Sequence, residues 1–103
     1  LPLVESLEVE GIIRTRAGDA LHAPGAVPLK MVQVGGDREY RTRSFSDGEF
    51  YLMGVVPGTY EIQVDEQWMA ARGLRLAPGS DAGLIARAGA GVVEFGLVLE
   101  PAP

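Results

Sequence analysis

Short runs of alternating apolar and polar residues, each closed by Gly or Pro, constrain this chain more than any other feature. In residues 7–14 and 60–65 the alternation has a period of two, which is typical of a strand with one face in a core and one in water. Turn signals recur at spacings of roughly 8–12 residues, and no helical repeat or βαβ pattern competes. We therefore predict an all-β fold of about seven strands, the others at 27–34, 40–44, 50–52, 74–76 and 93–99.

The lengths of the predicted loops favour a sandwich over a barrel. Seven strands joined by loops of uneven length fit two packed sheets better than a closed barrel. A chain of 103 residues makes one small domain, so we assign residues 1–103 to a single domain. Residues 1–5 and 101–103 are linker-like in composition, and the chain begins without Met, so we expect a fragment of a larger protein.

Three segments are less clearly patterned. In residues 27–34 two phases are open, one with Leu29 and Met31 facing inward and one with Val32 and Val34 facing inward. Residues 66–71 are compatible with one helical turn. Residues 80–91 are rich in small side chains and are predicted to be mostly loop.

Composition excludes several classes of activity. The chain has no Cys and a single His, His22, so it lacks a thiolate nucleophile and a zinc cluster. The formal net charge of −5 disfavours nucleic acid as a partner. No apolar run approaches the roughly 20 residues that span a bilayer, so we expect no membrane insertion by this segment. We predict no enzyme activity, no catalytic residue, no metal and no cofactor.

Residues 46–62, Ser-Asp-Gly-Glu-Phe-Tyr-Leu-Met-Gly-Val-Val-Pro-Gly-Thr-Tyr-Glu-Ile, carry a family resemblance. They resemble the D-G-x-F…G-L-x-P-G-x-Y-x-L signature of carboxypeptidase regulatory-like domains, which belong to the transthyretin-like group that includes Cna B-type repeats. The resemblance extends from about Val9 to Leu99. It implies a seven-stranded transthyretin-like (prealbumin-like) β-sandwich of Greek-key type, and it implies no enzyme activity.

Each signature residue has an expected structural role. Gly48 is expected to adopt a positive φ, with Asp47 accepting a bond from its own backbone. Phe50 and Tyr60 are expected on neighbouring strands, filling the core from one face. Pro57 presets φ for the next turn; Gly58 is expected to complete that turn, also at positive φ.

One pair of residues is a candidate for binding a partner. Trp68 and Met69 follow the strand at 60–65; Trp68 either covers an open end of the sandwich or is an exposed anchor for a partner, and both interpretations are open.

Carboxylates near Asp47 are too few for calcium, and a hydrogen-bonded turn is the preferred interpretation. Some Cna B-type relatives form an isopeptide bond between a Lys on the first strand and an Asn on the last; here the first predicted strand has no Lys and the chain has no Asn.

The predicted function is that of a non-catalytic module in a larger bacterial cell-envelope or secreted protein. It would act as a structural spacer or a protein-interaction platform, with partners in its own polypeptide or in another protein. Two alternatives are open: a periplasmic C-terminal domain of an outer-membrane usher-like protein, and a carbohydrate-binding module that binds a polysaccharide. A bacterial source is suggested by eight Arg against one Lys and by abundant Ala and Gly.

Overall fold

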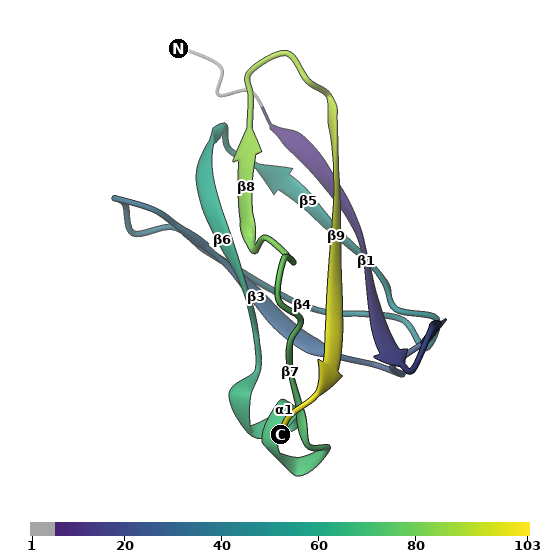
Figure 1. The fold of residues 1–103 in the computed structure, drawn as a ribbon. Coiled ribbons are helices and arrows are strands. Elements are labelled where there is room, and N and C mark those ends of the chain that lie inside the picture. The colour runs from purple at the N-terminus through teal and green to yellow at the C-terminus, as the bar shows by residue number, and fades with distance from the viewer. Residues whose placement is uncertain (1–5) are drawn as a thin grey trace, which may run out of the picture.

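The computed structural model describes residues 6–103, and the linker-like assignment of residues 1–5 lies outside them. The described chain forms an all-β sandwich of two sheets, with one short helix (Figure 1). Its elements are β1 (Leu7–Ala17), β2 (Ala20–His22), β3 (Pro28–Gln33), β4 (Glu39–Arg43), β5 (Glu49–Val55), β6 (Gly58–Val64), α1 (Glu66–Ala71), β7 (Leu74–Leu76), β8 (Gly83–Ala86) and β9 (Val92–Pro101).

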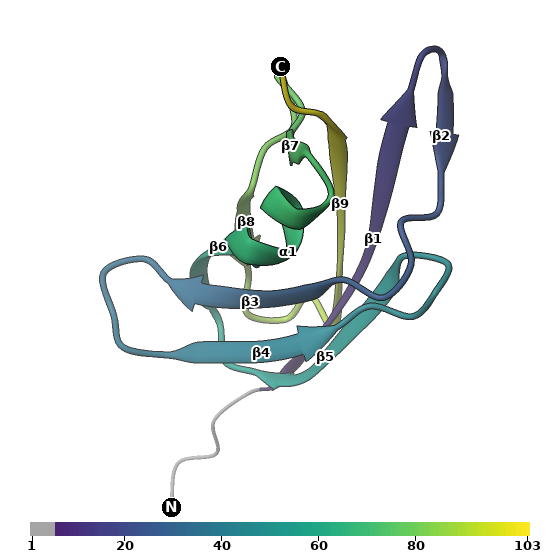
Figure 2. The ribbon, with the colours of Figure 1, turned by 90° about the horizontal axis from the view of Figure 1, so that it is seen from below.

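The two sheets contain five and four strands. The first sheet has the order β2-β1-β9-β7, and β5 also pairs antiparallel with β1. The second sheet has the order β4-β3-β6-β8, with antiparallel pairing throughout. Figure 2 shows the ribbon of β1 and β2 projecting from the body of the sandwich.

The first and last strands, β1 and β9, are parallel neighbours. Their register runs from Glu8 opposite Val92 to Thr15 opposite Leu99. In Figure 1 both strands therefore point the same way, and β9 ends at the opposite end of the sheet from the start of β1. A parallel pair needs a long connection, and here all the other strands provide it.

The core lies between the sheets and takes most of its side chains from the inward phases of β1, β3, β5, β6, β8 and β9. The open choice in residues 27–34 is resolved, because Leu29 and Met31 are buried whereas Val34 is 60% exposed. The fully or almost fully buried apolar side chains are Leu7, Val9, Ile13, Val27, Leu29, Met31, Phe50, Leu52, Val55, Tyr60, Ile62, Val64, Leu84, Ala86, Leu97 and Leu99.

The predicted number of strands was too low. Residues 6–103 form nine strands, since β2 and β8 fall in segments expected to be loops. All three residues of β2 are exposed, so no burial pattern marks it in the sequence. In β8 the alternation covers only four residues, of which Leu84 and Ala86 are buried. The helical turn expected at residues 66–71 is confirmed as α1.

Phe50 and Tyr60 do not lie on neighbouring strands of one sheet, as was expected. Phe50 lies on β5, which pairs with β1 in the first sheet, whereas Tyr60 lies on β6, which pairs with β3 and β8 in the second. Both side chains are fully buried. The chain crosses between the sheets at Val56 and Pro57, so the two rings enter the core from opposite sides.

Candidate interaction surfaces

The turn before β5 has the predicted geometry. The Asp47 Oδ1 atom accepts a hydrogen bond from the Glu49 amide at 2.9 Å, and Gly48 has a φ of +93°. The carbonyl oxygen of Gly48 accepts a bond from the Ile13 amide at 2.8 Å. A Cβ at position 48 would overlap the carbonyl oxygen of Ile13. Glycine is thus required here by conformation and by space.

The expectation for Gly58 was wrong. Gly58 does not have a positive φ; in this part of the chain Gly54 does, at +70°. The reason is that β5 and β6 belong to different sheets, so Val56 and Pro57 form a crossing between sheets and not a tight hairpin. A crossing of this kind does not need a left-handed residue at its last position.

Two tyrosines hold this crossing. The Tyr60 hydroxyl donates to the Val56 carbonyl oxygen at 2.5 Å, and the Val56 amide donates to the Tyr40 hydroxyl at 3.1 Å. The two rings meet edge to face, with centroids 5.8 Å apart. Burial raises the pKa of Tyr60 to about 12. Tyr60 therefore fixes the position of the crossing that contains Pro57.

Trp68 and Met69 lie on α1, at the end of the sandwich. Both side chains are half-buried and pack against the core. The Asp65 Oδ2 atom caps the helix by accepting a bond from the Trp68 amide at 2.9 Å. The Arg72 guanidinium lies 4.3 Å from the centroid of the Trp68 ring. One face of the indole is therefore covered by a cation.

Met69 also lines a groove at this end of the molecule. The groove has a volume of about 880 Å³ and includes apolar Ile62, Val64 and Leu76 as well as polar side chains such as Gln63. The two residues proposed for partner binding are thus placed on one helix, one beneath Arg72 and one beside the groove.

The position of Trp68 has a spectroscopic consequence. We expect its emission to be blue-shifted from that of free tryptophan and its quenching by acrylamide to be slow, because the ring packs on the core and lies under Arg72. The variant Arg72→Ala should quench faster with little change in stability. Emission at the wavelength of a fully solvated indole would contradict this packing. The measurement needs no labelling, since Trp68 is the only tryptophan.

The side-chain oxygen atoms of Ser44 and Asp47 form hydrogen bonds with the backbone of the fold. Ser44 is buried, and its hydroxyl accepts a bond from the Val27 amide at 2.8 Å and donates to the Gly25 carbonyl oxygen at 3.1 Å. Within residues 6–103 no group of three His, Cys, Asp or Glu side chains is placed to hold a metal ion. His22 lies exposed on β2.

The arginines of β4 carry charges that are partly paired within the chain. Glu39 accepts a hydrogen bond from Arg41 Nε at 2.8 Å and forms an ion pair with Lys30 Nζ at 3.5 Å. The hydrogen bond from Arg41 lowers the pKa of Glu39. These charges lie at the surface on the outer side of the four-stranded sheet, as the alternation of β4 indicates.

An exposed aromatic pair was missed by the sequence analysis. Phe45 is 60% exposed, and its ring centroid lies 5.8 Å from that of Tyr51, which is 38% exposed. Met53, on the same outward phase of β5, is 72% exposed. A signal was present, because Tyr51 and Met53 alternate with the inward Phe50 and Leu52 and so had to face outward. Phe45 lies in a turn, where alternation gives no direction.

Comparison with known proteins assigns no family. A scan against protein-family models finds no match to this chain. A search of curated protein sequences finds no similar protein. Among residues 6–103, no helix has the length and apolar character needed to cross a membrane.

Proposed function

We propose that this chain is a non-catalytic module of a larger bacterial cell-envelope or secreted protein, in which it acts as a spacer and an interaction platform. The observation that carries the proposal is the parallel pairing of β1 and β9. Because the first strand begins at one end of the sheet and the last strand ends at the other, neighbouring segments of a longer chain attach at opposite ends. A module with this connectivity adds its length to the distance between its neighbours.

The transthyretin-like, Greek-key assignment is part of the same proposal. The structural roles of the signature residues support this assignment. Asp47 and Gly48 form one turn, Tyr60 holds the crossing that contains Pro57, and Phe50 fills the core from the other sheet. None of these side chains is left over for chemistry, which supports a structural meaning of the motif.

Exposed apolar side chains support the proposed role as an interaction platform. Phe45, Met53 and Ile85 are each more than half exposed. Contiguous apolar patches on a surface commonly mark sites of contact with other proteins, and Phe45 forms the start of such a patch with Tyr51, whose ring centroid lies 5.8 Å away. Trp68 is a weaker basis for carbohydrate binding, because Arg72 covers one face of its ring.

A tandem protein tests the spacer geometry. Two copies are joined directly, residue 103 to residue 1, and studied by small-angle X-ray scattering beside the single copy. We expect the centres of the two copies to be separated by at least about 30 Å, the length of a ten-residue strand. Copies that fold back side by side would give a separation close to the molecular width of 22 Å, and that result would contradict the proposal. A tandem with a longer Gly-Ser joint controls for flexibility.

A further inference from the structure

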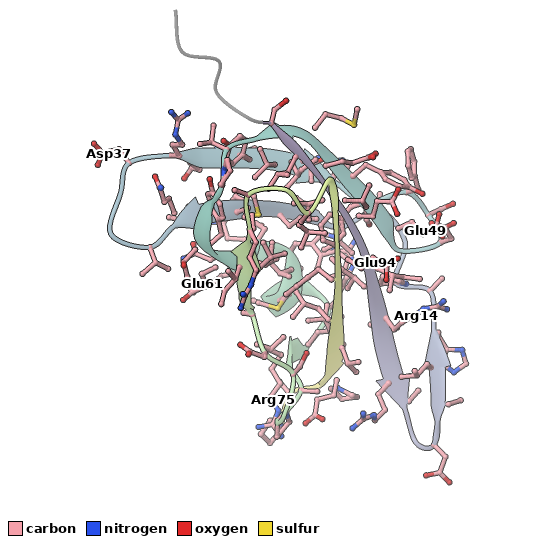
Figure 3. All side chains as sticks on the ribbon, turned by 90° about the horizontal axis from the view of Figure 1, so that it is seen from above. Arg14, Asp37, Glu49, Glu61, Arg75 and Glu94 are labelled. Atoms are coloured by element: carbon pink, nitrogen blue, oxygen red, sulfur yellow. The ribbon has the colours of Figure 1, made fainter. Side chains whose placement is uncertain are left out.

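Four carboxylates gather on the outer face of the five-stranded sheet. Glu8 and Glu10 come from β1, Glu49 from β5 and Glu94 from β9. In the strand register Glu10 lies between Tyr51 on one side and Glu94 on the other. Figure 3 shows Glu49 and Glu94 on the same side of the molecule. Three strands far apart in sequence thus bring like charges together.

Apolar side chains lie among these carboxylates. Ile12 is opposite Glu49 in the register, and Val92 is opposite Glu8. Together with the exposed Phe45, Tyr51 and Met53, they make a mixed surface with a shallow hollow beside Tyr51. We call this surface the acidic face; it consists of Glu8, Glu10, Ile12, Phe45, Glu49, Tyr51, Met53, Val92 and Glu94.

The charges of the acidic face have no cation paired with them within the described part of the chain. The ion pairs found there join Glu39 to Lys30 and Arg41, and Glu100 to Arg75. Glu10 and Glu94 lie side by side, an arrangement of like charges that destabilises a sheet. A hydrogen bond to Glu49, with the charges of Glu49 and Glu10, raises the pKa of the Tyr51 hydroxyl. Arg14 follows on the same outward phase of β1 and lies beside this face (Figure 3), but within residues 6–103 it forms no ion pair with these carboxylates. Four carboxylates beside one guanidinium leave the face with an excess of negative charge.

We propose that the acidic face docks a basic, amphipathic segment of a partner protein, in which Arg side chains alternate with apolar ones. The inference rests on the proposed function as an interaction platform and names its surface. Charge complementarity favours a cationic partner. Arg suits this face because its planar guanidinium binds carboxylates and also stacks on aromatic rings, here Phe45 and Tyr51. Apolar side chains of the segment would cover Met53 and Val92.

A peptide titration followed by NMR tests the proposal. The probe is an eight-residue peptide of alternating Arg and Val, and the control peptide has Glu in place of Arg. We expect the Arg peptide to shift amide signals of β1, β5 and β9 at the acidic face and the Glu peptide to leave them unchanged. Binding should weaken as salt is raised, because exposed charges are screened. Shifts confined to the four-stranded sheet, or no shifts, would overturn the proposal.

Two double variants separate a local effect from net charge. Glu10→Gln with Glu94→Gln removes two charges from the acidic face, and we expect affinity for the Arg peptide to fall roughly tenfold. Glu61→Gln with Glu66→Gln removes two exposed charges from β6 and α1 and should leave affinity unchanged. Equal loss in both variants, or self-association of the free domain through this face, would refute the proposal. Either result leaves the scattering test of the spacer geometry unaffected.

Discussion

Replacing Phe50 by Ala lowers the free energy of unfolding by about 3–5 kcal/mol. The side chain is fully buried, and its ring fills the space above Gly11, where a Cβ would overlap it. Because β1 approaches the ring closely at this glycine, the cavity left by Ala lies against backbone that cannot readily collapse into it. In a domain of this size the loss is a large share of the total stability. Urea denaturation followed by circular dichroism measures it.

Phe95 is the matched control for this prediction. The alternation of residues 93–99 predicts that Phe95 faces inward, together with Leu97. In the structure Phe95 is only half-buried and packs against the margin of the core. We therefore expect Phe95→Ala to cost less than half as much as Phe50→Ala. Equal losses from the two variants would contradict the described packing.

Replacing Gly48 by Ala is expected to cost about 2–4 kcal/mol. The residue has a φ of +93°, and a Cβ there overlaps the carbonyl oxygen of Ile13. The backbone must move, and the movement weakens the bond from the Ile13 amide to the Gly48 carbonyl oxygen. Thermal unfolding monitored by circular dichroism gives the change in midpoint.

Gly54 separates the two causes of this cost. It lies on β5 with a φ of +70°, but nothing is within 4 Å of a Cβ placed there. Gly54→Ala therefore carries the conformational cost alone, about 1–2 kcal/mol. If both variants lose the same stability, the overlap with Ile13 contributes nothing and the described geometry of the turn is wrong.

The elements that were predictable are those whose burial alternates over many residues. In β6 the inward set Tyr60, Ile62 and Val64 is buried without exception. The same rule holds in the first part of β1 and in the second part of β9. The turn at Asp47 and Gly48 was also predictable, because the hydrogen bond from the Glu49 amide to Asp47 joins residues two positions apart. Both features, the burial of alternate side chains and the hydrogen bonding of a turn, depend on residues that are close together in the sequence.

What could not be predicted depends on contacts between distant segments. Alternation tells which face of a strand is buried but not which sheet the strand joins, so Phe50 and Tyr60 were wrongly placed together. The surroundings of Trp68 depend on Arg72 and on the end of the sandwich. The acidic face depends on the register that sets Glu10 beside Glu94.

The parallel pairing of β1 and β9 also determines how the domain responds to mechanical force. A pull between the start of β1 and the end of β9 acts along both strands in opposite directions. The hydrogen bonds between the two strands, from the Glu8–Val92 pair to the Thr15–Leu99 pair, are then loaded in shear. They must therefore break together and not one after another. Forced unfolding is governed by the barrier to this step. Because of this pairing, we expect the domain to resist forced unfolding when its two ends are pulled apart.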